Sequence, residues 1–101
     1  MTPYVLALVA EDYRMSLRAI TTGRSLENVK ARRMAMFIAW KLGVTQRRIA
    51  HAVQLDGSNV CLGIGWIAGH LRQMPTGAVA RRTARLMQAA RSLPMTSMPR
   101  R

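Results

Sequence analysis

One stretch of the chain, residues 43–72, decides the fold: GVTQRRIAHAVQLDGSNVCLGIGWIAGHLR. Thr45 is of a residue type that caps helices, and it precedes a predicted short helix over 46–53. The turn that follows contains Asp56, which is placed to cap a longer helix that extends to Leu71. Two helices joined by a tight turn that contains glycine form a helix-turn-helix unit, and we predict one here.

The apolar residues of this unit, over about 45–71, are spaced as two closely packed helices require. One face of the second helix carries residues that recur every three or four positions: Val60, Ile64, Ile67 and Leu71. The small Ala50 lets the two helices approach each other, and Leu55 and Val60 fill the space between them. An ordinary hairpin of two helices in a bundle has similar spacing, so that alternative stays open.

The rest of the chain predicts further helices, because no segment alternates between apolar and polar residues as a strand does. These helices are expected over about 3–13, from the capping Ser16 through Ile20, from Leu26 or Asn28 to Leu42, and from the capping Thr76 to about Ala90. Residues 21–25 are interpreted as a polar loop, and Gly43 closes the central helix. The sequence therefore predicts an all-α fold, a small helical bundle over 1–92 with a flexible tail over 93–101.

The charge of the chain points to a polyanionic partner. The 101 residues suit a single domain, and 16 Lys and Arg against 4 Asp and Glu give a formal charge of +12. Residues 1–27 carry as many acidic as basic residues, so the whole excess lies in 28–101. Such a field attracts nucleic acid or an anionic membrane by releasing condensed counterions. We expect double-stranded DNA as the partner.

Several other classes of protein are excluded by composition. One cysteine rules out a disulfide framework and fits a reducing, cytoplasmic compartment. The uncharged stretch 57–71 is too short and too polar for a membrane span, and the first residues do not resemble a secretory signal. We therefore expect a cytoplasmic protein that makes no membrane contact.

Catalysis and metal binding are not expected either. His51 and His70 lie far apart, with no acidic residue or cysteine at ligand spacing. Two of the four carboxylates are adjacent at 11–12, which does not suit paired acid and base catalysis. Cys61 has no companion base and is interpreted as a buried thiol or a groove-edge contact. We predict no enzyme activity, no cofactor and no metal.

If the helix-turn-helix unit reads DNA, the first turn of its second helix enters the major groove. The candidates for contact with base edges are Gly57, Ser58, Asn59 and Leu62. An asparagine can form two hydrogen bonds with adenine, and a leucine can contact a thymine methyl group. Helix capping is the alternative role for Ser58. No Lys or Arg lies between Arg48 and Arg72, so this helix offers no arginine to read guanine.

Contacts to the DNA backbone are expected from six residues at helix starts and in the loop: Arg24, Arg32, Arg33, Thr45, Arg47 and Arg48. Arg24 is a candidate for the minor groove as well, with a solvated loop arginine as the alternative.

Leu62 and Trp66 form a second apolar face on the helix that ends at Leu71. This face either packs against the last helix or is an exposed surface for a protein partner. The last helix has a modest apolar face, which Thr83 interrupts, and a basic opposite side with Arg81 and Arg85. Membrane binding by that helix is the weaker interpretation, because its apolar face is narrow and has no aromatic residue.

Residues 9–72 resemble the C-terminal DNA-binding domain of the bacterial replication initiator DnaA. The similar segments are VAEDY at 9–13, ARRMAM at 31–36, IAHAV at 49–53 and DGSNV at 56–60. The resemblance implies a helical bundle like that domain or the Trp repressor. It also implies that the loop with Arg24 contacts the minor groove and that residues 56–60, aligned with the family's acidic-His-Thr-Thr-Val signature, read the major groove.

The chain departs from the family pattern in ways that change the expected target. Gly57, Ser58 and Asn59 stand where the family has His-Thr-Thr, so the initiator's own DNA box is not the expected site. Gln54-Leu55 replaces a Gly-Gly-Arg, and there is no glycine-rich loop of a nucleotide-binding domain. The resemblance therefore implies a free-standing DnaA-like domain, nucleoid-associated, that regulates replication or transcription in a bacterium or phage.

A second hypothesis is a protein-interaction adaptor. Such a protein would keep the DnaA-like fold and dock on replication or transcription machinery through the 57–71 helix. The lack of basic residues on that helix favours this alternative.

Overall fold

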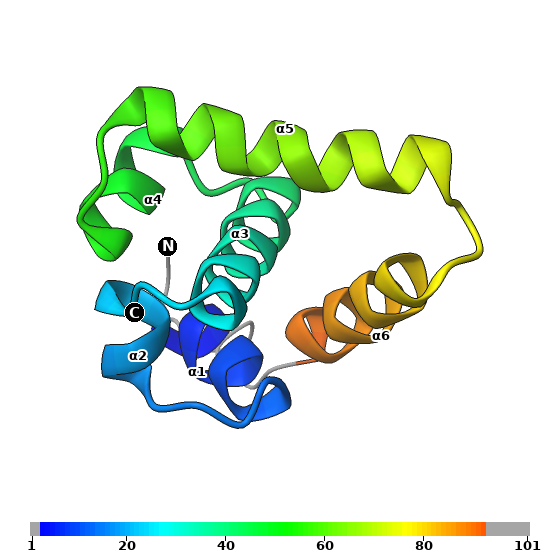
Figure 1. The fold of residues 1–101 in the computed structure, drawn as a ribbon, viewed down its shortest axis with the longest axis horizontal. Helices are drawn as coiled ribbons and strands as arrows, with labels where there is room; N and C mark the ends of the chain where they lie inside the picture. Colours follow the sequence, from blue (N-terminus) through cyan, green and yellow to red (C-terminus); the bar gives the residue numbers. More distant parts are fainter. Residues whose placement is uncertain (1–2, 93–101) are drawn as a thin grey trace.

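The computed structural model describes residues 3–92, and within them it contains helices and no strand. The helices are α1 (Pro3–Asp12), α2 (Leu17–Thr22), α3 (Leu26–Lys41), α4 (Gln46–Val53), α5 (Gly57–Gln73) and α6 (Ala78–Arg91). Figure 1 shows α3 at the centre, α5 across one end of it, and α1 and α6 on the opposite side from α4 and α5. The all-α prediction is confirmed, and the predicted tail over 93–101 lies outside the described residues.

The helix starts follow from local capping chemistry. The hydroxyls of Ser16 and Thr45 and the carboxylate of Asp56 each accept a hydrogen bond from the backbone N–H three residues later, at 3.0, 3.3 and 2.9 Å. All three were predicted as caps, and the structure confirms them. Ser25 caps α3 in the same way, at 3.2 Å. Gly43 follows the end of α3 with a φ of +96°, a conformation that favours glycine.

Two predicted helix boundaries were wrong. Thr21 and Thr22 belong to α2 rather than to the loop, and their hydroxyls donate to carbonyls four residues earlier. Thr76 does not cap α6; the N-cap is Gly77, whose carbonyl accepts from the backbone N–H of Arg81 at 3.0 Å. The carbonyl of Thr76 instead accepts a hydrogen bond from the Arg81 guanidinium at 2.7 Å. The Arg81 side chain thus provides a donor for a backbone carbonyl in the turn before α6.

The core of the protein is built around α3. Seven of its residues are buried: Ala31, Met34, Ala35, Met36, Phe37, Ile38 and Ala39. At the end of this helix Trp40 is 40% exposed. A fully buried Ile or Met side chain contributes roughly 1.5–3 kcal/mol. The other helices therefore derive much of their stability from packing against α3.

The contact of α5 with α3 depends on a glycine. Gly63 is buried, and a β-carbon at this position would overlap the terminal methyl group of Met36 on α3. The missing side chain leaves room for the buried Met36 side chain between the two helices. On either side of this point Val60, Ile64 and Ile67 are buried, as the sequence predicted.

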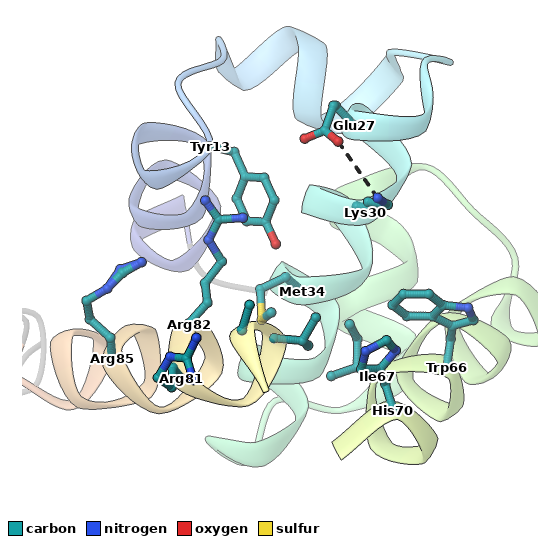
Figure 2. Close-up of a pocket in the computed structure, with 12 residues that line it drawn as sticks. Tyr13, Glu27, Lys30, Met34, Trp66, Ile67, His70, Arg81, Arg82 and Arg85 are labelled. Atoms are coloured by element: carbon teal, nitrogen blue, oxygen red, sulfur yellow. Dashed lines mark ion pairs between the residues drawn. The ribbon is translucent and has the colours of Figure 1, made fainter. Parts of the chain in front are cut away.

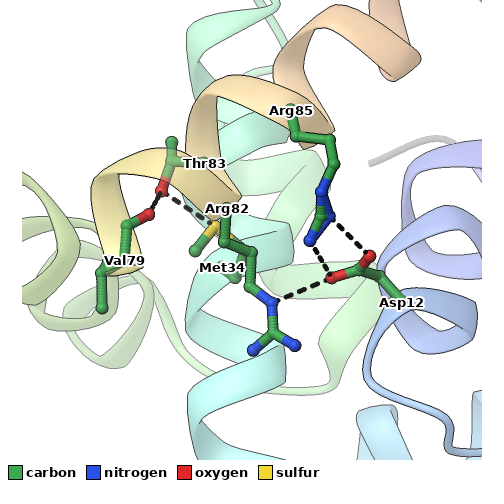
Figure 3. Close-up of polar contacts among 6 residues, drawn as sticks. All are labelled: Asp12, Met34, Val79, Arg82, Thr83 and Arg85. Atoms are coloured by element: carbon green, nitrogen blue, oxygen red, sulfur yellow. Dashed lines mark hydrogen bonds and ion pairs between the residues drawn. The ribbon is translucent and has the colours of Figure 1, made fainter. Parts of the chain in front are cut away.

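Charged groups hold α6 against the end of α1. Asp12 forms an ion pair with Nε of Arg82, 2.9 Å away, and accepts hydrogen bonds from two guanidinium nitrogens of Arg85, at 3.0 and 3.3 Å (Figure 3). The guanidinium of Arg82 also lies 3.9 Å from the centre of the Tyr13 ring. Burial raises the pKa of the Tyr13 hydroxyl, and the nearby Arg82 opposes this effect. No local sequence pattern predicts this ion pair, because Asp12 and Arg85 lie 73 positions apart.

Thr83 does not interrupt the apolar face of α6 as predicted. It is buried beside Leu86, Met87 and Ala90. Its hydroxyl donates to the carbonyl of Val79 at 2.7 Å and lies 3.4 Å from the sulfur of Met34 (Figure 3). A hydroxyl that bonds to its own helix can be buried at little cost, so the face stays continuous.

The same substitution at two glycines of α5 tests the packing against α3. Gly65→Ala adds a methyl group in open space, so we expect it to raise the free energy of unfolding by about 1 kcal/mol through helix propensity alone. Gly63→Ala gains the same propensity but forces Met36 to move within a packed core, which costs about 1–3 kcal/mol. Urea denaturation should therefore show Gly63→Ala as the less stable of the two. Equal stability would mean that α5 does not approach α3 at Gly63.

Candidate nucleic-acid interface

Helices α4 and α5 are joined by the three-residue turn 54–56. Gln54 lies in the left-handed region with a φ of +58°, which reverses the chain. Ile49 and Val53 of α4 are buried, as is Val60 of α5, so the backs of both helices belong to the core. Their opposite faces point outward at the same end of the molecule (Figure 1).

The first turn of α5 presents unused polar side chains. Gly57, Ser58 and Asn59 are all exposed. The capping position is occupied by Asp56, which accepts from the backbone N–H of Asn59. The alternative in which Ser58 caps the helix is therefore not what the structure shows. The Ser58 and Asn59 side chains form no hydrogen bond with another residue in 3–92, so they are available to an external partner.

Exposed arginines start the neighbouring helix. Arg47 and Arg48 are exposed in the first turn of α4, and neither forms an ion pair with another described residue. Thr45 is exposed directly before them and accepts from the backbone N–H of Arg48. Gln46 is exposed in the same turn. It was not among the predicted contact residues, although its position directly after the cap indicates exposure.

Arg24 lies in the loop between α2 and α3 and is exposed. It makes no recorded ion pair in the described part of the chain. Helix α2, which precedes this loop, packs against both α3 and α4. Three of the predicted backbone arginines, Arg24, Arg47 and Arg48, are exposed and form no ion pair with another described residue.

Arg32, also predicted to contact phosphates, has partners inside the protein. Its Nε donates to the carbonyl of Ile20 at 2.9 Å, and a terminal nitrogen donates to the carbonyl of Gly23. Burial lowers the pKa of this guanidinium from its ordinary value. Arg32 thus satisfies the last carbonyls of α2 and fixes the start of the loop that carries Arg24.

Arg33 is likewise turned toward the protein. Its guanidinium lies 5.1 Å from the centre of the Trp66 ring, within the range of a cation–π contact. Trp66 also lies against His70, with ring centres 5.2 Å apart. Trp66 is 39% exposed and Leu62 is 70% exposed. Of the two alternatives for this second face, packing against α6 is not observed for Leu62.

The structure also describes the cysteine, the potential metal ligands and the length and polarity of the helices. Cys61 is exposed, so the first of its two interpretations, a buried thiol, was wrong, and the groove-edge contact stays a prediction. Within residues 3–92 no cluster of His, Cys, Asp or Glu is arranged to hold a metal ion. No helix in that range has the length and apolar character needed to cross a membrane.

Comparisons with known protein families, with curated proteins and with solved structures find no match to this chain. The interface has therefore to be argued from its own geometry.

Two arginine substitutions test whether Arg32 stabilises the fold while the exposed Arg24 does not. Arg32→Gln removes two hydrogen bonds from a charged donor, so we expect it to lower the free energy of unfolding by about 1–2 kcal/mol. Arg24→Gln changes an exposed loop residue and should change the free energy of unfolding by less than about 0.5 kcal/mol. Urea denaturation of both variants measures the difference. Equal losses would contradict the assignment of Arg32 to the interior of the fold.

Proposed function

We propose that this protein binds double-stranded DNA through α4 and α5, used as a helix-turn-helix unit. The observation that carries the proposal is the contrast between the two sides of these helices. Their backs are fully buried in the core, while the first turns present unpaired arginines and unused polar side chains. A surface of this composition has the donors and the charge that a DNA duplex requires.

In this proposal the first turn of α5 enters the major groove. Asn59 is placed to bond an adenine edge, Ser58 accepts or donates to a neighbouring base, and Gly57 allows a close approach of the helix. Leu62, one turn further along, contacts a thymine methyl group. These side chains need no rearrangement of the helix start, because Asp56 already caps it.

Backbone contacts hold this helix in register. Arg47 and Arg48 lie at the start of α4, where they meet phosphates beside the groove, and Thr45 lies next to them. Arg24 reaches the backbone or the adjacent minor groove. Arg32 and Arg33 are not assigned phosphate contacts, because carbonyls and Trp66 already occupy them.

The biological role proposed is that of a regulator of replication or transcription in a bacterium or phage, associated with the nucleoid. The support is the resemblance of residues 9–72 to the DnaA DNA-binding domain, together with a charge of +12 in 101 residues. No catalytic step, cofactor or metal is part of this proposal.

Removing the Asn59 side chain tests base reading. We expect Asn59→Ala to weaken binding to a preferred duplex by about 1–3 kcal/mol, because the bonds to one base edge are lost. Binding to random duplexes should not change. Fluorescence anisotropy with both duplexes gives the comparison, and an equal loss on both would remove Asn59 from the reading role.

Arg47→Ala tests the phosphate contacts. Here all duplexes should be bound more weakly to a similar degree, because the contact carries no sequence information. The slope of log affinity against log salt should fall by about 1, since one fewer counterion is released. Arg72→Ala is a suitable control, because this exposed arginine lies at the far end of α5. An unchanged salt slope in the Arg47 variant would place that residue away from the phosphates.

A protein-interaction adaptor is the second candidate. Leu62 and Trp66 are exposed on α5. No Lys or Arg lies between Arg48 and Arg72, so α5 has no basic side chain beside these two residues. Both features favour the adaptor. On this hypothesis Leu62→Ser abolishes binding to a replication or transcription protein and leaves the affinity for DNA unchanged. The DNA-binding proposal expects Leu62→Ser to act on DNA affinity instead.

A further inference from the structure

A cavity of about 810 Å³ lies between α3, α5 and α6, on the side of the molecule away from the turn between α4 and α5. It exists because α5 and α6 diverge from the turn that joins them, so they do not close over α3 (Figure 1). Figure 2 shows its lining, with Tyr13 and Arg82 on one side and Trp66 and His70 on the other. The DNA-binding proposal does not use this cavity, and the adaptor hypothesis shares only Trp66 with its lining.

The floor of the cavity is apolar. Met34 and Ile67 are buried beneath it, Val79 is half-buried, and the partly exposed Trp66 forms one wall. Apolar surface of this kind, enclosed on several sides, gains free energy when an apolar group displaces water from it. The Tyr13 hydroxyl points into the same space and adds a polar group at its edge (Figure 2).

The rim of the cavity is cationic. Its lining includes Lys30, Arg81, Arg82 and Arg85, with Glu27 as the only carboxylate among the lining residues described. Asp12 already pairs with Arg82 and Arg85. Lys30 and Glu27 are 3.9 Å apart and both are substantially exposed, which makes a weak ion pair. The one recorded partner of the Arg81 guanidinium is the neutral carbonyl of Thr76.

We propose that this cavity binds a small amphipathic anion, with an aromatic or short aliphatic body and one carboxylate or sulfonate group. The body lies on Met34, Ile67 and Val79 beside the Trp66 ring. The anionic group lies toward Arg81, whose guanidinium contacts only the neutral carbonyl of Thr76 among the described residues. The volume is in the range of about 300–1,000 Å³ that is typical of pockets for single small molecules, rather than for a protein partner. This site is independent of the DNA proposal, because Ser58, Asn59, Arg47 and Arg24 do not line it.

A pair of dyes that differ in charge tests the proposal on the whole protein. Anilinonaphthalene sulfonate carries the expected anionic group, and N-phenylnaphthylamine has the same ring system without it. We expect saturable binding of the anionic dye at one site per chain, measured by its fluorescence, and about tenfold weaker binding of the neutral dye. Arg81→Gln should lower the affinity for the anionic dye about three- to tenfold and change the affinity for the neutral dye less than about twofold. Decanoate should displace the anionic dye, and decanol should do so only at higher concentration.

Two alanines of α6 provide a matched control for the position of the site. Ala78 lines the cavity and is exposed, whereas Ala84 is exposed and does not line it. Ala78→Phe should lower the affinity for the anionic dye at least about tenfold, and Ala84→Phe should leave it unchanged. Circular dichroism confirms that each variant is folded. Equal binding of both dyes, equal effects of Ala78→Phe and Ala84→Phe, or displacement by an acidic peptide but not by decanoate would each overturn the proposal.

Discussion

The close approach of α5 to α3 at Gly63 is the constraint on which the arrangement of the molecule depends. A β-carbon at this position would overlap the terminal methyl group of the buried Met36 side chain, which would have to move. The contact fixes α5 by its middle, so both ends of the helix extend past α3 (Figure 1). One end, with α4, forms the candidate DNA surface, and the other diverges from α6 and opens the cavity. Both proposed sites therefore follow from one packing contact.

The scarcity of carboxylates shapes the surface as strongly as the number of arginines. There are four acidic residues in the chain, and three of them have clear local tasks. Asp12 joins α1 to α6, Asp56 caps α5, and Glu27 lies beside Lys30. None of them pairs with Arg24, Arg47 or Arg48 in the part of the chain that the structure describes. The positive field is therefore left unbalanced where DNA binding is proposed, whereas on α6 it is partly neutralised.

The parts of the structure that the sequence predicted are those controlled by neighbouring residues. The capping residues Ser16, Thr45 and Asp56 act over three positions, and the apolar face of α5 follows helical periodicity. The position of the exposed first turn of α5 could be predicted for the same reason. The errors concern contacts between distant segments. Nothing near Arg32 indicates that it bonds the end of α2.

The same limit applies to the cavity and to α6. Its lining comes from α3, α5, α6 and Tyr13, so no local pattern marks it. Thr83 was predicted to interrupt an apolar face because periodicity ignores hydrogen bonds within the helix, and the bond to Val79 removes the penalty.

The central claim is that the first turn of α5 reads DNA sequence. Selection of bound duplexes from a random pool, at about 150 mM salt where nonspecific contacts are weakened, tests it most directly. The account predicts enrichment of one short motif by the native protein and its loss when Ser58 and Asn59 are both replaced by alanine. Binding without any enriched motif would contradict sequence reading and favour the protein-interaction adaptor.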